Sequence, residues 1–524
     1  MQLYSLQFAL FLAASLAAYY AVGRLLGKGQ WVVLLAASLG FYLASGWQNM
    51  AFILLTSATT WASGVACGRI DARCAEARRA ARDRAGKKAL KEAAKRRKWA
   101  VLLACMLLNF GVLGYLKYWE VILAGLGDPG FMASGLLLPL GISFYTFQSV
   151  GYAIDCYNSK YAPEPNYARF LLFVSFFPQL IQGPINRYDD MAAQLFERRS
   201  FDLARSRRAL LLVGFGAMKK YVMADVLVTT ISQSLDHMGP NTPGSVVAFG
   251  ILLYTVQQYG DFSGGIDMVR GVAELFGVRM AENFRQPYFS TSLSDFWRRW
   301  HMTLGAWMRD YVFYPLAVRP SLLRLNKWGT EHLGKHVGRT LSACIGNVVV
   351  FLLVGLWHGA EAHYVLWGLY NGLVIASADM LRPAFAALTR ALRLDVGSAG
   401  YRVFAIARTF LLVNVGRYFD RLYDFGDCLQ GIANTLFNFN PGEFLDWFAV
   451  YSVDKMDACL AIAAVACVIV FIVSFNKERG VDVCGWVLAR PFSVRLAMYI
   501  VVGVLIAASF ALSDAGGGFL YANF

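Results

Sequence analysis

The chain has 524 residues, of which 57% are hydrophobic and 16% are charged, and its formal net charge is +15. Soluble domains carry roughly 25% charged residues, so this composition excludes an ordinary soluble protein and indicates a polytopic membrane protein. The nine cysteines lie in or beside apolar stretches without CxxC or Cys/His spacing. This pattern argues against a disulfide framework or a metal site and favours small buried side chains.

Thirteen apolar stretches follow one another along the chain. They lie near 8–26, 31–46, 49–66, 99–117, 131–153, 168–183, 207–231, 245–260, 342–357, 362–380, 401–416, 457–474 and 496–512. The first has no basic segment before it and no small-residue cleavage site, so we expect a retained helix rather than a signal peptide. A span needs about 20 apolar residues, and we therefore expect an all-α fold with roughly 10–13 membrane helices in one membrane domain over 1–524.

Two of these stretches are interrupted by Gly, Pro or polar residues. They read "FMASGLLLPLGISFYTFQSVGYA" (131–153) and "RFLLFVSFFPQLIQGP" (near 168–183). We expect both to be tilted or re-entrant, which a membrane permits only where protein buries the irregular backbone.

The charge distribution predicts an orientation. Residues 68–98 hold thirteen Lys/Arg against four Asp/Glu, a net +9, in an Ala-rich, helix-prone sequence. A basic helix can bind nucleic acid, but between two spans we favour a cytoplasmic loop lying on anionic lipid headgroups and expect no nucleic-acid partner. The three preceding spans then place the N-terminus outside, and the basic loop 475–495 places the C-terminus outside as well.

The segment 283–340 contains no clean span and is rich in Arg, Asp, Trp and Tyr. Such a segment is either an amphipathic helix at the interface or the lining of a polar cavity. Within it, Trp297 and His301 are four residues apart and are expected to share a helix face, while Asp295 can pair with Arg298 or Arg299. An interfacial Trp/Arg helix is the alternative.

His358 ends an apolar span in "VVVFLLVGLWHGAEAHYVLWGLYNGL". A histidine at membrane depth is costly unless it faces a polar cavity, so it indicates a functional site; an interfacial histidine beside the anchor Trp357 is the alternative. Four other histidines lie in predicted loops or at span ends, where we expect them to be solvated: His237, His332, His336 and His363.

Together, His301 and His358 suggest acid–base chemistry on a group that crosses the bilayer. The sequence has no Walker loop, HExxH or CxxC motif, and the glycines of "GDFSGGID" lack the context of a dinucleotide fingerprint. We expect these glycines to permit close helix packing. A different class of function, a proton-coupled transporter or flippase of lipid-linked sugars with the histidines as a proton relay, stays open.

Several blocks resemble the membrane-bound O-acyltransferase (MBOAT) family, and most closely its bacterial branch of alginate and peptidoglycan O-acetylation proteins and teichoic-acid D-alanyl transfer proteins. The resemblance covers most of residues 1–420, with an MBOAT core over 131–420. The blocks are "PLGISFYTFQ", "FFPQLIQGPINRYDD", the long segment from "GDFSGGID" to "WRRWHMTLGAWMRDYVFYPL", and "VGLWHGAEAHYVLWGLYNGL".

The resemblance implies a ring of tilted helices around a central tunnel, with His358 and His301 as the catalytic residues. It implies a tunnel or substrate-binding role for Asp295, Trp297, Arg298, Arg299, Trp300, Trp357 and Asn371. The sequence departs from the family pattern twice: "AVRPSLLRLNKW" follows "FYPL", and Asn371 stands where many relatives have a second histidine.

The implied reaction uses a cytoplasmic acyl thioester, acetyl-CoA or a carrier-protein thioester, as a substrate, with no bound cofactor and no metal. His358 would act as general base on the acceptor hydroxyl. His301 would position the acyl group or polarise its carbonyl.

The chain ends in "GGGFLYANF", a Phe-x-Tyr-x-x-Phe pattern within the segment 513–524. It is similar to a C-terminal motif of envelope-acylation systems, which implies an extracytoplasmic tail with Tyr521 as acyl relay and Phe519 and Phe524 as docking residues. An interfacial aromatic anchor is the alternative.

We therefore expect an O-acyltransferase of the bacterial inner membrane that passes an acyl group, first of all acetyl, through Tyr521 to an extracytoplasmic partner resembling an acyltransferase or esterase. That partner would acylate a cell-envelope polysaccharide. Within the enzyme class, D-alanyl transfer from a carrier protein to teichoic acid or a similar polymer is the alternative.

Overall fold

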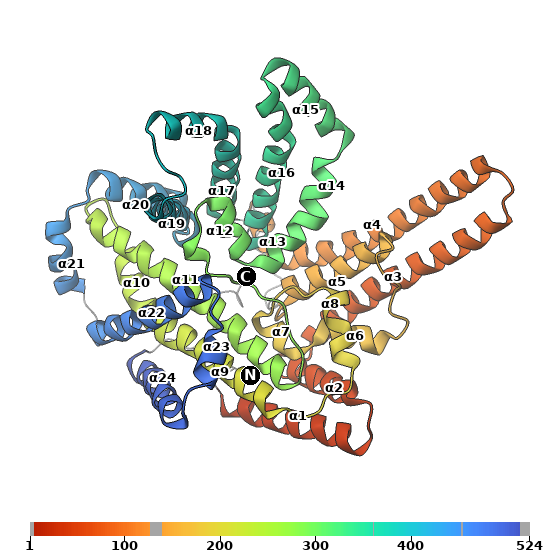
Figure 1. Cartoon of the computed structure of the whole chain (residues 1–524), viewed down its shortest axis with the longest axis horizontal. Helices are drawn as coiled ribbons and strands as arrows, with labels where there is room; N and C mark the ends of the chain where they lie inside the picture. The colour runs from red at the N-terminus through yellow and green to blue at the C-terminus, as the bar shows by residue number, and fades with distance from the viewer. Residues whose placement is uncertain (1–4, 126–138, 360, 452–453, 514–524) are drawn as a thin grey trace. The chain divides into compact units, whose positions relative to one another are not determined.

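The computed structural model describes residues 5–125, 139–359, 361–451 and 454–513. All regular elements within these ranges are helices, as the sequence predicts (Figure 1). The described residues group into two compact units, one formed by residues up to 210 with 269–281, the other by 211–268 and 282 onward. One membrane domain over 1–524 stays a prediction, because a membrane domain can contain several such units.

The first unit is built from the N-terminal helices. They are α1 (Leu6–Leu25), α2 (Gln30–Leu43), α3 (Asn49–Ala80), α4 (Arg84–Gly125), α5 (Ile142–Tyr157), α6 (Tyr167–Ser175), α7 (Phe177–Gln182) and α8 (Tyr188–Phe196). Two further helices, α9 (Leu203–Ala217) and α11 (Gly244–Leu275), have residues in both units.

The second unit contains the polar-aromatic segment and the C-terminal helices. Its elements are η1 (Met218–Ala224), η2 (Asp225–Leu227), α10 (Val228–Leu235), η3 (Pro287–Phe289), α12 (Leu293–Arg299), α13 (Met302–Met308), η4 (Arg309–Phe313), α14 (Tyr314–Ala317), α15 (Pro320–His332), α16 (Lys335–His358), α17 (Ala362–Met380), α18 (Arg382–Ala391), α19 (Ala399–Arg421), α20 (Phe425–Phe437), η5 (Pro441–Glu443), α21 (Phe444–Tyr451), α22 (Met456–Glu478), α23 (Val483–Leu488) and α24 (Phe492–Leu512).

Six described helices are long and apolar enough to cross a membrane: α1, α3, α4, α16, α22 and α24. The count is seven if α17 and α18, which meet at an angle of 60°, form one broken span. Other predicted spans fall on helices that are short, interrupted or charged, such as the 14-residue α2, the α9–η1 segment, α11 and α19. The chain is thus a multi-pass membrane protein, while a ring around a central tunnel stays a prediction.

The basic stretch 68–98 continues two spans as helix instead of forming a loop. It comprises the end of α3 and the start of α4, which run side by side as a hairpin (Figure 1). At its base, buried Lys98 donates through Nζ to Asp71 Oδ2 (2.7 Å) and to Ser159 Oγ (2.9 Å). Most of the other basic side chains of the stretch are exposed. Their expected contact with lipid headgroups stays a prediction.

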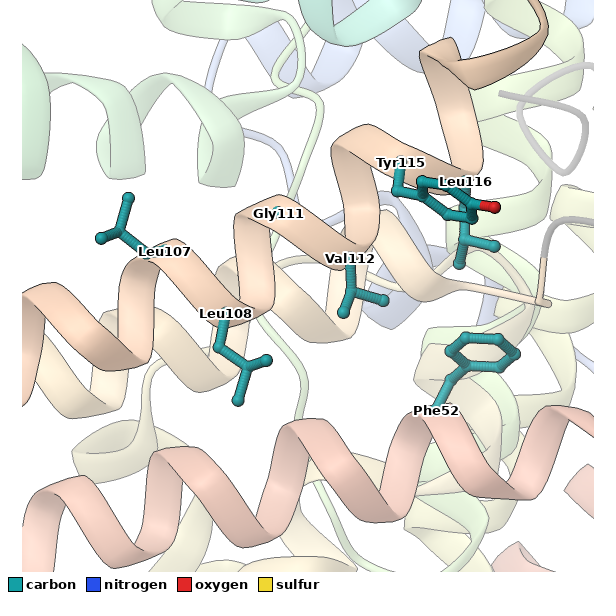
Figure 2. A pocket seen from close by; sticks show the side chains of 7 residues that line it. All are labelled: Phe52, Leu107, Leu108, Gly111, Val112, Tyr115 and Leu116. Atoms are coloured by element: carbon teal, nitrogen blue, oxygen red, sulfur yellow. The ribbon is translucent and has the colours of Figure 1, made fainter.

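A shallow apolar groove follows the apolar parts of the same two helices (Figure 2). Its volume is about 370 Å³, and its lining residues are Phe52, Leu107, Leu108, Gly111, Val112, Tyr115 and Leu116. The lining offers one phenol and no second titratable group. General acid–base chemistry needs a positioned proton donor or acceptor near its operating pH, so we place no chemistry in this groove.

The irregular segments expected in the first unit are buried in protein where the structure describes them. From Ile142 to Ala153 every residue of α5 is buried, and the chain breaks at buried Phe176 between α6 and α7. The side-chain amides of Gln148 and Gln179 donate to the carbonyl oxygen of Phe173 at 2.9 Å and 2.5 Å. These bonds satisfy a carbonyl that loses its helical partner at the break.

Two lysines are buried in the second unit. α9 passes into the π-helix η1, which carries Lys219 and Lys220 into the protein interior. Lys219 Nζ lies 2.7 Å from Asp267 Oδ2, and Lys220 Nζ lies 2.5 Å from Asp261 Oδ1 and 2.7 Å from Asp225 Oδ1. Charges are retained in such surroundings only when they are paired, and α11 supplies two of these three carboxylates.

The glycines of "GDFSGGID" permit close packing, as predicted. A Cβ on Gly264 of α11 would lie 2.7 Å from the carbonyl oxygen of Gly216 and 2.8 Å from the amide nitrogen of Lys220. Since real Cβ atoms do not approach backbone atoms so closely, α11 contacts the α9–η1 backbone only because this residue is glycine.

Candidate active site

His301 lies in a sharp turn between two short helices. α12 begins at the cap residue Ser292, whose Oγ accepts the Asp295 N–H at 3.1 Å, and it ends at Arg299. Trp300 is extended, and His301 has φ 45° and ψ 52°, a left-handed conformation that is uncommon for residues other than glycine. The expected shared helix face of Trp297 and His301 is therefore wrong, because the helix ends between them.

Asn283 holds this turn from the loop before α12. Its Oδ1 lies 3.2 Å from His301 Nδ1 and accepts the Thr303 backbone N–H at 3.0 Å and the Thr303 hydroxyl at 2.9 Å. Its main-chain carbonyl accepts the Met302 N–H at 3.0 Å. Four contacts from one residue thus fix the backbone and the ring of the turn. No motif or local pattern in the sequence points to Asn283.

The His301 ring is buried among aromatic rings, with the Phe262 centroid at 4.8 Å and the Trp357 centroid at 6.1 Å. Burial, and then the nearby ring of His358, lowers the pKa of His301 to about 3. His301 is therefore a neutral imidazole at physiological pH. The Trp357 ring lies 6.1 Å from the His301 ring and 4.8 Å from the His358 ring, so the structure brings the two histidines to the same aromatic side chain.

His358 is the last residue of α16 and is 6% exposed. Its ring centroid lies 4.8 Å from Trp357, 5.2 Å from Trp367 and 5.8 Å from Tyr364. The helices α16 and α17 pack closely here, because a Cβ on Gly355 would lie 2.4 Å from the Tyr364 carbonyl oxygen. The span therefore ends with its histidine inside an aromatic enclosure rather than in solvent.

Trp297 and Asn371 also meet. The indole Nε1 of Trp297 donates to Asn371 Oδ1 at 3.0 Å, and Asn371 Nδ2 donates to the Trp367 carbonyl oxygen at 2.8 Å. The Trp297 ring packs edge-on against Trp367 at 5.3 Å. Asn371 thus joins α12 to α17. Trp300 stacks on Phe296 within the same layer, with a centroid distance of 5.5 Å.

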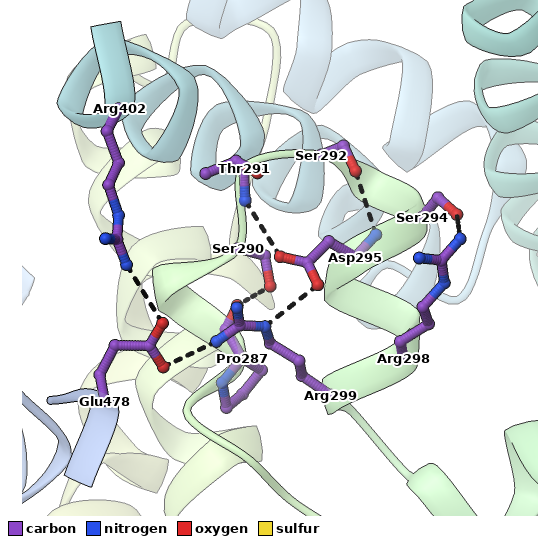
Figure 3. Close-up of polar contacts among 10 residues, drawn as sticks. All are labelled: Pro287, Ser290, Thr291, Ser292, Ser294, Asp295, Arg298, Arg299, Arg402 and Glu478. Atoms are coloured by element: carbon purple, nitrogen blue, oxygen red, sulfur yellow. Dashed lines mark hydrogen bonds and ion pairs between the residues drawn. The ribbon is translucent and has the colours of Figure 1, made fainter. Parts of the chain in front are cut away.

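An ion-pair cluster holds the other side of α12 (Figure 3). Arg299 pairs with Asp295 at 3.1 Å and with Glu478 of α22 at 2.8 Å, and Arg402 of α19 pairs with Glu478 at 3.2 Å. Of the two partners expected for Asp295, the structure selects Arg299. Arg298 is exposed, and its guanidinium donates to Ser294 Oγ at 3.4 Å.

Replacing Glu478 with Gln is expected to lower the midpoint of thermal unfolding, because it removes the charge that Arg299 and Arg402 share. Both carboxyl and guanidinium groups of the Arg299 pair are mostly buried, and a hydrogen bond to a charged group contributes roughly 1.5–3 kcal/mol. The measurement is thermal unfolding of the detergent-purified protein. Glu331→Gln, at an exposed position of α15, is the control; equal midpoints for both variants would contradict the assigned role.

Two of the four histidines expected to be solvated differ from expectation: His336 is half-buried and donates through Nε2 to the Asp379 carbonyl oxygen at 3.0 Å, and His363 is buried. His363 was expected to be solvated, yet it is 1% exposed, and its Nδ1 donates to the Phe419 carbonyl oxygen at 2.9 Å. α17 begins at Ala362, four residues after His358, and its first residues pack against α19. The exposed His237 and His332 agree with expectation.

Other polar groups of the second unit also went unpredicted. Buried Arg417 pairs with Asp420 at 2.7 Å, Gln258 donates to the same carboxylate at 2.6 Å, and the Arg417 guanidinium lies over the Trp300 ring at 5.0 Å. An arginine and an aspartate three residues apart in an apolar stretch were the available signal.

The tail residues Phe519, Tyr521 and Phe524 lie outside the described residues. The helix before them, α24, is anchored where it ends: the Phe510 ring packs on Tyr221 of η1 at 5.0 Å, and Ser513 Oγ donates to the Asp225 carbonyl oxygen at 3.4 Å.

The comparisons with known proteins place this site in a family. A family model for the membrane-bound O-acyltransferase family matches residues 162–409, which include both histidines. The chain is 32% identical over 442 residues to a protein named probable alginate O-acetylase AlgI from Pseudomonas putida, covering 80% of this chain and 79% of the relative. The chain belongs to the membrane-bound O-acyltransferase family.

Further relatives of this O-acyltransferase act on different polymers, by their names. A peptidoglycan O-acetyltransferase from Helicobacter pylori is 29% identical over 366 residues, 64% of each chain. A teichoic acid D-alanyltransferase from Bacillus subtilis is 30% identical over 258 residues, 47% of this chain and 60% of the relative. This membrane protein is thus an acyltransferase. By their names, its relatives transfer different acyl groups to different acceptors.

Proposed function

We propose that this O-acyltransferase takes an acetyl group from a cytoplasmic thioester donor and passes it across the inner membrane, through Tyr521, to an extracytoplasmic partner that acylates a cell-envelope polysaccharide. The observation that carries the proposal is the position of buried His301 and His358 on either side of the Trp357 ring, inside the region matched by the family model. The similarity to alginate and peptidoglycan O-acetylating proteins supports acetyl as the group.

In this proposal His358 is the general base. Its imidazole takes the proton of the acceptor hydroxyl while the hydroxyl oxygen attacks the thioester carbonyl. The carbon–sulfur bond then breaks, and the proton passes to the departing thiolate, so the products are the new ester and a thiol. A buried centre suits this step because it keeps water from hydrolysing the thioester.

The proposed relay through Tyr521 has a leaving-group basis. A phenol has a pKa of about 10, near the roughly 8.5 of a thiol, whereas an aliphatic alcohol is closer to the roughly 15.7 of water. A tyrosyl ester therefore keeps much of the transfer potential of the thioester. Phe519 and Phe524 would dock the tail, and three glycines before them would let it move.

The orientation proposed from charge, with both termini extracytoplasmic, is what the relay requires. The donor would then reach the histidines from the cytoplasm, and Tyr521 would approach from the opposite side. Membrane lipids and the extracytoplasmic partner are the proposed contacts of the outer regions.

D-alanyl transfer is the second candidate. It is favoured by the similarity to teichoic acid D-alanyltransferases, which reaches 30% identity. In that case the donor would be the thioester of a carrier protein, and the same histidines would serve the same proton transfer.

The experiment that tests the function is intact-mass analysis of the C-terminal peptide after the purified protein is incubated with acetyl-CoA. An acetyl increment on Tyr521 supports the proposal, and an increment only after incubation with a D-alanyl carrier protein supports the second candidate. Acyl transfer that leaves the C-terminal peptide unmodified would contradict the proposed relay through Tyr521. Proton-dependent transport of a lipid-linked sugar without acyl transfer would contradict the proposed function.

A further inference from the structure

We propose that Asn283 is a positioning residue that fixes the tautomer of His301, so that Nε2 of this histidine accepts a hydrogen bond and does not donate one. The inference deepens the proposed function, because it assigns the chemical role of the second histidine in the acyl-transfer centre. From sequence alone, His301 was expected either to position the acyl group or to polarise its carbonyl.

The first step concerns the orientation of the Asn283 amide. Oxygen and nitrogen of an amide side chain look alike, and their assignment follows from the hydrogen-bond partners. The Thr303 backbone N–H can only donate, and it points at this end of the amide at a distance of 3.0 Å. The atom facing it is therefore the oxygen, Oδ1.

The second step concerns the imidazole. His301 Nδ1 lies 3.2 Å from the same Oδ1. A side-chain amide oxygen only accepts hydrogen bonds, so Nδ1 must carry the proton and donate it. In a neutral imidazole one ring nitrogen is a donor and the other an acceptor, which leaves the lone pair on Nε2.

The third step concerns the protonation state. His301 is 4% exposed, and burial holds its imidazole in the neutral form. A carbonyl-polarising role needs an N–H directed at the carbonyl oxygen, and Nε2 of this tautomer has none. Of the two roles expected from sequence, His301 therefore keeps that of positioning the acyl group through an accepting Nε2, while His358 takes the proton of the acceptor hydroxyl.

The backbone conformation of His301 also depends on Asn283. A left-handed histidine is strained and persists only where its surroundings hold it. Asn283 holds both sides of it, through the Met302 N–H and through the Thr303 N–H and hydroxyl. Deleting this side chain would disturb fold and tautomer together, so the informative substitution is one that keeps the oxygen.

Asn283→Asp keeps the accepting oxygen and adds a charge beside Nδ1–H. The carboxylate stabilises the imidazolium form and raises the pKa of His301; an opposite charge at this distance shifts a pKa by about one to three units. Activity that depends on neutral His301 is then lost as the pH falls through the raised pKa. The acidic limb of the pH–rate profile should therefore move to higher pH by about one to three units.

The surroundings of His301 make this shift interpretable. Of the groups on the elements packed against the ring, Phe262 and Trp357 carry no charge, and His358 is the titratable neighbour that acts on its pKa. The control is Asn326→Asp, because Asn326 Oδ1 likewise accepts a backbone N–H, that of Ser342 at 2.9 Å. The control should keep the wild-type acidic limb. A folded Asn283→Asp protein that also keeps it would overturn the inference.

A measurement that needs no activity separates this inference from the proposed function. The ¹⁵N spectrum of the wild-type protein labelled at histidine, with the His301→Gln spectrum for assignment, reports which ring nitrogen carries the proton. We expect protonated Nδ1 and unprotonated Nε2 for His301. Protonated Nε2 would overturn the inference even if acyl transfer is observed, and the expected spectrum would uphold it even if the transferred group is not acetyl.

Discussion

Replacing His358 with Ala is expected to reduce acyl transfer by about 10²- to 10⁴-fold, the usual contribution of a general base. The side chain is buried among Trp357, Trp367 and Tyr364, so no water-exposed group can take its place directly. In cells, ester-linked acyl groups on the envelope polymer should fall to background while the protein remains in the membrane. The measurement is alkali-released acetate from isolated envelopes, with the protein level followed by immunoblot.

His336→Ala is the matched control for this substitution. His336 lies near the start of the same helix, α16, and its Nε2 donates to the Asp379 carbonyl oxygen at 3.0 Å. Losing this bond removes one hydrogen bond and no proposed catalytic group, so acylation should persist. Because alanine leaves a cavity at position 358, His358→Gln should accompany it; normal acyl transfer by either variant would refute the role of the imidazole.

Replacing Tyr521 with Phe is the second change expected to bring envelope acylation to background. The substitution removes one hydroxyl and keeps the aromatic ring, so a tail that only anchors the chain at the membrane interface would be unaffected. A relay, by contrast, needs the phenolic oxygen as the acyl acceptor. Acyl transfer from the donor to the envelope should therefore stop. Any hydrolysis of the thioester donor by the purified protein would still be detectable.

Tyr499→Phe is the control for the tail. Tyr499 lies on α24 and is 40% exposed, so the same atom is removed from the helix that precedes the tail. Mass spectrometry of the C-terminal peptide should show an acyl increment in the wild type and the control and none in Tyr521→Phe. Full envelope acylation by Tyr521→Phe would leave the tail as an anchor.

The sequence singled out His301 and His358, which the structure buries beside the same tryptophan, but it predicted less of their surroundings. A histidine at membrane depth costs free energy and is rare, so its position at the end of an apolar span marks His358 as a candidate functional residue. The sequence block around His301 is specific for the family. Their shared contact with the Trp357 ring could be expected from the family but not from spacing, since 57 positions separate the two histidines.

The local geometry at His301 was out of reach for a periodic pattern. An i, i+4 relation between Trp297 and His301 assumes a continuous helix, and no glycine or proline lies between them to mark the break. At the break, the side chain of Asn283, 18 residues before His301, holds the turn through its contacts with His301 and Thr303. Glu478 is 179 residues from Arg299. Neither partner has a local signal, because hydrogen bonds between distant segments leave no period in the sequence.

The helical character of the basic stretch was partly predictable. Its Ala-rich composition indicated helix, but treating it as a loop between two spans missed that both spans continue into it. The prediction for His363 was wrong for a related reason. Its position at a predicted span end suggested exposure to solvent, whereas the start of α17 packs against α19.

The paired lysines of η1 bear on how the chain is assembled in the membrane. Lys220 has a nearby partner in Asp225, five residues later, but Lys219 is made 48 residues before its partner Asp267. An unpaired ammonium group is costly in hydrocarbon, so the α9–η1 segment has no favourable resting place in lipid until α11 has been synthesised. The two segments are thus expected to leave the insertion machinery together, as a neutralised pair, and not one after the other.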